Sequence, residues 1–128
     1  ELQIGAITVR KDKVARHTYT NSNTLYNYMM GLGILEKAEQ HTSCKITRDK
    51  RSIKILNGSS CIDYLQTLVW FHRANKAILK DNPIHSHTDD GIIFIDWITN
   101  MIWSRYEDNY SGWYDILSPC IQEQRLFF

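Results

Sequence analysis

Several features that would identify a protein class are missing from this sequence. Its three cysteines, Cys44, Cys61 and Cys120, stand far apart, and none belongs to a C-x-x-C pair. An odd number of cysteines without a disulfide framework is typical of a reducing compartment. No secretory signal is recognisable either. We therefore expect an intracellular protein, in the cytoplasm or the nucleus.

Long apolar runs and phosphate-binding loops are also missing. The strongest apolar stretch, residues 91–103, is interrupted by Asp96 and Asn100, and it is shorter than the roughly 18 residues of a membrane span. The Gly31-Leu32-Gly33 triplet lacks both a third glycine and the Lys-Ser/Thr pair of a P-loop. We expect no membrane association and no cofactor.

The length and composition are those of a globular domain. The chain has 128 residues, of which 43% are hydrophobic, and this is enough to build one domain with a substantial core. We interpret residues 1–128 as a single domain. Because the first residue is Glu1 rather than Met, we expect an excised domain or a processed product.

Two β-hairpins are predicted from the pattern of apolar residues. The first joins β-prone residues 2–9 and 14–19 across a charged turn at residues 10–13. The second joins residues 44–47 and 52–55, which alternate apolar with polar side chains on either side of residues 48–51. This alternation indicates half-buried strands.

The remaining sequence predicts helices. Cap-forming residues precede a helix over residues 25–38, although Gly31 and Gly33 each weaken it by roughly 1 kcal/mol relative to Ala, so the alternative is an end near Gly33 with a strand at residues 34–35. Ser60 precedes a second helix over residues 61–80, which Asn82-Pro83 ends. A third covers residues 92–106, a short one residues 114–117, and an amphipathic turn ends the chain. The predicted fold is α+β, with antiparallel hairpins covered by helices in the order ββ-α-ββ-α-α-α.

A net charge of +1 hides two oppositely charged halves. Up to Lys54 the chain carries ten basic and five acidic residues, a net charge of +5. The remainder carries five basic and nine acidic residues, a net charge of −4. A local field of this kind attracts phosphate polymers even when the total charge is small.

The second hairpin concentrates the positive charge on one surface. β-ribbons often present such cations to phosphate groups, although exposed Lys and Arg also solvate strands and discourage edge pairing. We predict nucleic-acid contact, to DNA or RNA, through Lys45, Arg48, Lys50, Arg51 and Lys54, extended by Arg10, Lys11 and Lys13 if the hairpins lie side by side.

Aromatic side chains gather in the acidic half. Trp and Tyr are common hot spots of protein interfaces, and the helix over residues 92–106 is apolar almost all round, which calls for cover on several sides. The alternative is that these rings fill the core. We predict a protein partner or homodimer interface at Trp103, Tyr106, Tyr110 and Trp113.

The sharpest chemical motif is His85-Ser86-His87-Thr88-Asp89-Asp90. It resembles the H-x-H-x-D-H zinc loop of metallo-β-lactamase-like hydrolases, with Asp90 in place of the last His. The His-x-His pair is also similar to the metal motif of rolling-circle nucleases, which would make Tyr106 and Tyr110 nucleophiles. These resemblances imply a metal site at His85, His87 and Asp89. The interpretation that we favour is a polar loop in which Asp89 or Asp90 caps the next helix.

Three functional hypotheses follow from these observations. The first is a non-catalytic module that binds nucleic acid or a nucleoprotein through the basic hairpin and self-associates, or binds a protein partner, through the aromatic helices. The second is a protein–protein interaction module alone, of the kind found among viral and mobile-element accessory factors. The third is a metal-dependent nuclease or hydrolase that uses His85, His87 and Asp89.

Overall fold

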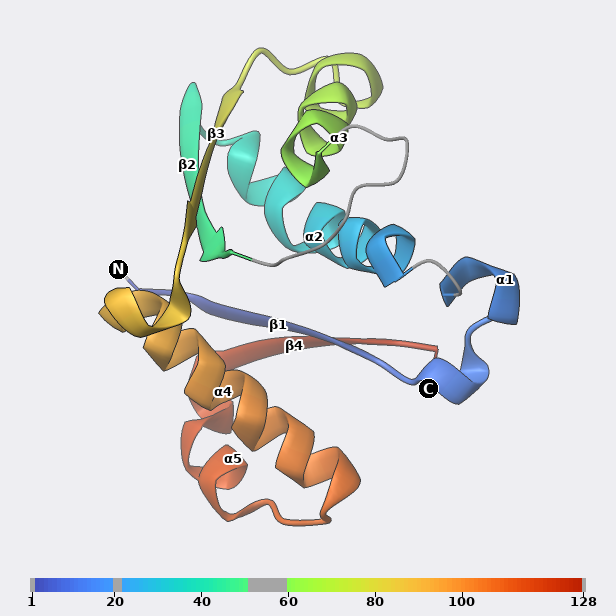
Figure 1. Cartoon of the computed structure of the whole chain (residues 1–128), viewed down its shortest axis with the longest axis vertical. Helices are drawn as coiled ribbons and strands as arrows, with labels where there is room; N and C mark the ends of the chain where they lie inside the picture. Colours follow the sequence, from blue (N-terminus) through green and yellow to red (C-terminus); the bar gives the residue numbers. More distant parts are fainter. Residues whose placement is uncertain (1, 20–21, 51–59, 128) are drawn as a thin grey trace.

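The computed structural model describes residues 2–19, 22–50 and 60–127. Within these ranges the chain is an α+β fold with two separate two-stranded sheets (Figure 1). β1 (Ile4–Val9) pairs with β4 (Ile121–Leu126), and β2 (Ser43–Asp49) pairs with β3 (Ile78–Ile84). Both pairs are parallel. The α+β class is confirmed, but the predicted antiparallel hairpins are wrong, because every described strand has a parallel partner.

The first predicted hairpin is replaced by a pairing between the two ends of the chain. After β1, a 3-10 turn (η1, Lys11–Lys13) leads into the short helix α1 (Arg16–Tyr19), where a second strand was predicted. β1 pairs instead with β4, from Ile4 opposite Ile121 to Val9 opposite Leu126. Parallel strands cannot be joined by a tight turn, so this sheet is closed by nearly the whole chain. The predicted terminal amphipathic turn is therefore wrong as well.

The second predicted hairpin is replaced by a parallel pair that covers α2 and α3. The strand predicted at residues 44–47 is confirmed as part of β2, while residues 52–55 lie outside the described residues. The strand beside β2 is β3, with Ser43 opposite Ile78 and Asp49 opposite Ile84. Asn82 and Pro83 lie inside this strand rather than after a helix. Proline is tolerated there because β3 is an edge strand.

The helix predicted over residues 61–80 begins where expected and ends early. α3 (Cys61–Thr67) is continued by a π-helical turn (η2, Leu68–His72), and Ala74, whose φ is 48°, reverses the chain. The Gln66 side chain then accepts a hydrogen bond from the Leu79 amide and donates one to the Ala77 carbonyl. These two bonds hold the start of β3 against α3, so a strand begins at Ile78.

α2 (Ser22–Ala38) runs through both of its glycines. Gly31 is buried against the side chains of Leu65 and Leu68, so close packing with α3 offsets the weaker helix propensity of glycine. The alternative end near Gly33 is wrong. The buried core of this part of the molecule is formed by residues of α2, α3, η2 and the start of β3: Leu35, Ala38, Ile62, Leu65, Val69, Ala77 and Leu79.

Two predicted helices of the acidic half are confirmed. α4 (Asp90–Glu107) and α5 (Gly112–Leu117) lie on one side of the β1–β4 sheet, and α2 lies on the other (Figure 1). Ile7 of β1 reaches Gly33 of α2, and Tyr114 of α5 is buried. In the described part of the chain, no helix has the length and apolar character needed to cross a membrane.

Candidate functional site

Large apolar side chains project into solvent from α4 and α5. Trp97 is 68% exposed, Trp113 is 61% exposed and Ile116 is 66% exposed, and Phe94 is also exposed. We name these four residues the apolar α4–α5 surface. At 100° per residue, Trp97 lies on the opposite side of α4 from residues 95 and 102. Ile92 and Ile98 of α4 are buried, whereas Phe94, Ile95, Trp97 and Trp103 are exposed. Part of this apolar helix therefore has no cover from the described part of the chain.

The apolar α4–α5 surface exposes a large aromatic area. At roughly 150–250 Å² per aromatic side chain, the exposed parts of Phe94, Trp97 and Trp113 present on the order of 350 Å². This lies within the range of the largest apolar patch on a typical monomer, about 300–600 Å², before Ile116 is counted. Patches of this size are often functional.

The structure separates the four residues predicted to bind a partner. Trp103, Tyr110 and Trp113 are each more than half exposed. Tyr106 is half-buried, and its hydroxyl donates a 2.8 Å hydrogen bond to the Glu123 carboxylate. The role of Tyr106 that the structure shows is therefore an internal one.

Glu123 connects four elements and was not predicted from the sequence. Its side chain is 6% exposed. Its carboxylate accepts hydrogen bonds from Thr8 Oγ1 on β1 (2.7 Å), from the Tyr106 hydroxyl on α4 (2.8 Å) and from the Tyr114 hydroxyl on α5 (2.6 Å). Arg125 Nε lies 3.8 Å from the same carboxylate. We call this group the Glu123 cluster; it ties α4 and α5 to the β1–β4 sheet.

Burial and hydrogen bonding shift the pKa of Glu123 in opposite directions. Burial opposes its ionisation, but the hydrogen bonds from Tyr114, Thr8 and Tyr106 together outweigh burial and lower the pKa of the carboxyl. Burial raises the pKa of Tyr106 and of Tyr114, and their hydrogen bonds to the carboxylate raise it further. The cluster therefore holds a carboxylate and two neutral phenols near neutral pH.

A groove of about 950 Å³ lies between β1 and α4. One wall is the whole of β1 and the turn after it, and the other is a stripe of α4 that runs from Ile95 to Glu107. Trp103 lies on this stripe and is 57% exposed. The charged side chains of the groove stand together at one end: Arg10, Lys11, Asp12 and Glu107. The space between the walls is consequently lined by uncharged residues.

Among the described residues, those predicted to bind phosphate lie in two separate places. Arg10, Lys11 and Lys13 lie at or after the end of β1, beside α1, whereas β2 ends near the opposite end of α2 (Figure 1). The condition under which Arg10, Lys11 and Lys13 would extend the basic surface of β2 is therefore not met. Arg51 and Lys54 lie outside the described residues.

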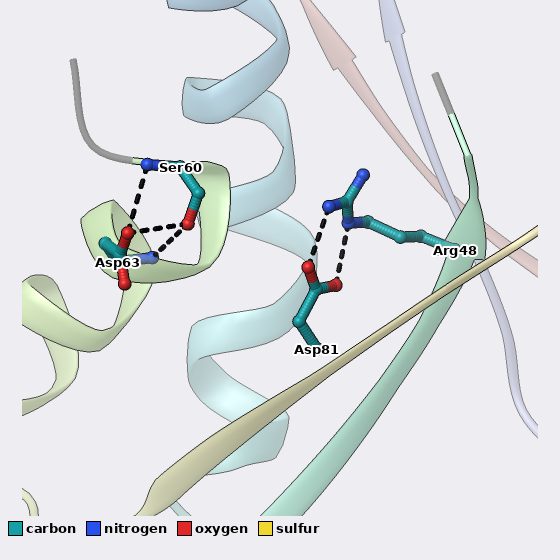
Figure 2. A network of polar contacts seen from close by, with 4 residues as sticks. All are labelled: Arg48, Ser60, Asp63 and Asp81. Atoms are coloured by element: carbon teal, nitrogen blue, oxygen red, sulfur yellow. Dashed lines mark hydrogen bonds and ion pairs between the residues drawn. The ribbon is translucent and has the colours of Figure 1, made fainter. Parts of the chain in front are cut away.

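Two of these cations already have anionic partners. The Arg48 guanidinium donates hydrogen bonds to both carboxylate oxygens of Asp81, each of 2.8 Å (Figure 2). This pair joins β2 to β3, and the bond to Asp81 raises the pKa of Arg48. At the end of β1, Arg10 Nε lies 2.9 Å from Asp12.

Figure 2 also shows the capping box at the start of α3, in which Ser60 and Asp63 bond each other's backbone amides.

Lys45 has a cationic neighbour that the sequence did not indicate. It stands opposite Lys80 in the register of β2 and β3, and both are exposed. The adjacent residues Cys44 and Leu79 point into the core, so the two lysines share the outer face of this sheet. Lys50 follows at the end of β2 and is exposed.

The His85–Asp90 loop contains the predicted helix cap. The Asp89 carboxylate accepts a 3.1 Å hydrogen bond from the Ile92 amide and caps α4, which confirms that interpretation. The rings of His85 and His87 stack with their centroids 5.7 Å apart. Within residues 2–19, 22–50 and 60–127, no three His, Cys, Asp or Glu side chains converge as metal ligands would.

No protein-family model, curated protein or solved structure matches this chain. Within the described residues, the features that bear on function are the apolar α4–α5 surface, the groove and the Glu123 cluster. The sequence held a partial signal for the apolar α4–α5 surface, because a helix that is apolar almost all round is expected to be covered on several sides. It held none for the Glu123 cluster, in which the bonded residues Thr8 and Glu123 are 115 residues apart.

Proposed function

We propose that this chain is a non-catalytic protein-interaction module that self-associates through the apolar α4–α5 surface. The observation that carries the proposal is the exposure of Trp97 and Trp113, each by more than 60%. Tryptophan is enriched among the residues that dominate interface energies, and it is costly to leave in water. A second copy of the chain would supply the cover that α4 and α5 lack within the described residues.

Acidic side chains border this surface and determine how self-association responds to salt. Asp96, Asp108 and Asp115 are exposed on or beside α4 and α5. Two copies that meet here bring these like charges together. Added salt screens that repulsion, while the apolar contact is retained. Self-association should therefore strengthen as the salt concentration rises.

The test replaces two exposed tryptophans of the apolar α4–α5 surface, and the control replaces a tryptophan elsewhere. In Trp97→Glu/Trp113→Glu, light scattering should show a monomer with an unchanged unfolding midpoint. The matched control is Trp70→Glu in η2, where the indole is 46% exposed and a dimer should remain. A wild-type protein that is monomeric at high micromolar concentration would overturn the proposal, and so would a double variant that unfolds.

A second candidate function, nucleic-acid binding, is favoured by the pairing of Lys45 with Lys80. Two exposed cations side by side on a rigid sheet can contact neighbouring phosphates. Arg48 is excluded from this set because its guanidinium is bound to Asp81. The proposed contacts are Lys45, Lys80 and Lys50.

Salt distinguishes this candidate from self-association. The affinity for a duplex oligonucleotide should fall with salt, at a slope of about −0.9 per phosphate contact. Lys45→Glu/Lys80→Glu should abolish the binding, while Lys76→Glu, an equal charge change at an exposed residue before β3, should retain most of it. Binding that is absent at low salt, or that the double variant retains, would remove nucleic acid from the account.

A further inference from the structure

The β1 strand presents one unpaired edge to the groove beside α4. Among the described residues β1 pairs with β4 alone. The Arg10 amide donates to the Leu126 carbonyl at 3.2 Å, so Arg10 and every second residue before it direct their backbone groups at β4. Successive residues of a strand alternate between its two edges. The amides and carbonyls of Gly5, Ile7 and Val9 therefore point away from β4.

These backbone groups can pair with the backbone of another extended chain. An exposed strand edge is a template on which another extended chain can pair. β1 is a wall of the groove along its full length, and the lining residues come from β1, the turn after it and α4, with none from β4. The groove thus lies on the side of β1 where the unpaired amides are.

The opposite wall suits the side chains of an extended segment. Ile95, Ile102 and Trp103 line the groove from α4, and Ile95 and Trp103 are each more than half exposed. Side chains of an added strand that point toward α4 would cover them. At about 3.3 Å per residue, the six residues of β1 accommodate a partner strand of about six residues.

Charge defines the occupant further. The charged residues of the groove stand at one end and include both signs, and the remainder of the lining is uncharged. An acidic or basic segment would lose its hydration there without gaining a partner. An uncharged apolar segment would lose little.

We propose that the groove between β1 and α4 binds an extended, uncharged segment of a partner protein, which adds to β1 as a third strand. This site is distinct from the self-association of the proposed function, because Trp97 lies on the other side of α4. Main-chain hydrogen bonds to Gly5, Ile7 and Val9 supply affinity, and the α4 wall selects apolar side chains, as in other cases of strand addition.

Gly5 offers a matched pair of substitutions that isolates the backbone contact. A Cβ at Gly5 meets nothing within 4 Å, so Gly5→Ala keeps the amide and should keep binding. Gly5→Pro removes the amide that points into the groove while leaving the bonds to β4 in place. The probe is a synthetic octapeptide selected from a phage-displayed library on the full chain. Its affinity should fall about tenfold in Gly5→Pro, the effect of one lost hydrogen bond and a misaligned strand.

A second variant keeps the test decisive if Gly5→Pro is poorly folded. Thr99 lines the groove from α4 and is exposed, so Thr99→Trp should fill the groove and abolish peptide binding. Trp97→Glu should leave peptide binding unchanged even though it disrupts self-association, so the two proposals fail independently. Peptide binding that survives both Gly5→Pro and Thr99→Trp would overturn the inference. Loss of the homodimer in Gly5→Pro would also overturn it, because a second copy would then occupy the edge.

Discussion

Replacing Glu123 by Gln tests the connection between α4, α5 and the β1–β4 sheet. The substitution keeps the size of the side chain and removes its charge. Three hydroxyl donors now point at this carboxylate, from Thr8, Tyr106 and Tyr114. A glutamine offers a single acceptor oxygen, and its NH₂ group meets hydroxyls that must rotate to accept. The variant should therefore fold with a weakened junction.

The magnitude follows from the hydrogen bonds that change. A hydrogen bond to a charged group contributes about 1.5–3 kcal/mol, and the three bonds share one carboxylate, so their effects do not add. Some bonding to the amide persists in the variant. We expect Glu123→Gln to lower the free energy of unfolding by about 2–3 kcal/mol at neutral pH.

The stability that Glu123 contributes depends on pH in one direction. Because the pKa of Glu123 is lowered on folding, its contribution is full above the ordinary Glu pKa of about 4.3. It is lost as the pH falls through the lowered value. The difference in stability between wild type and Glu123→Gln should therefore shrink in acid. Tyr106 and Tyr114 have raised pKa values, so the stability that they contribute is lost as the pH rises above about 10.

Urea unfolding followed by tryptophan fluorescence measures both effects. Glu36→Gln is the control, since Glu36 is exposed on α2 and should change the free energy of unfolding by less than about 0.5 kcal/mol. If Glu123→Gln matched this control at neutral pH, the Glu123 cluster would have no role in holding α4 and α5. A difference that grew in acid would refute the assigned direction of the pKa.

Two further substitutions test local features of α3 and the turn that follows η2. Ser60→Ala removes the side chain that accepts from the Asp63 amide at 3.2 Å, and thermal melts should show a loss of about 1 kcal/mol, typical of an N-cap; an unchanged melting temperature would speak against the capping box. Ala74→Gly should stabilise the protein by about 0.5–1 kcal/mol, because the φ of 48° at Ala74 is unfavourable for a residue with a Cβ; a destabilised variant in the same melts would contradict this account of the turn.

Local patterns predicted the helices better than they predicted the sheets. Apolar periodicity and capping residues placed α2, α4 and α5, and Ser60 marked the start of α3. The end of α3 depends on contacts that no local pattern encodes, because the Gln66 side chain bonds the backbone of Ala77 and Leu79 where β3 begins. Asn82 and Pro83 indicated a break, and the edge position of β3 accommodates them.

Strand pairing could not be predicted because it joins distant segments. β1 pairs with β4 more than 110 residues later in the chain, and a charged turn after β1 is equally compatible with a hairpin. The Glu123 cluster could not be predicted for the same reason, because its members are far apart in the sequence. A partner interface at Trp103 and Trp113 stays a prediction, and both side chains are exposed. The exposure of Trp97 and Ile116 could be recognised only once the orientations of α4 and α5 were known.

Sedimentation equilibrium of the wild-type chain tests the central claim most directly. We expect a reversible monomer–dimer equilibrium at micromolar concentrations. It should shift toward dimer as sodium chloride is raised, because screening relieves repulsion between the acidic residues around the apolar α4–α5 surface. A chain that stays monomeric at every salt concentration would contradict self-association through this surface. A dimer that dissociates as salt is raised would assign its interface to opposite charges instead of Trp97 and Trp113.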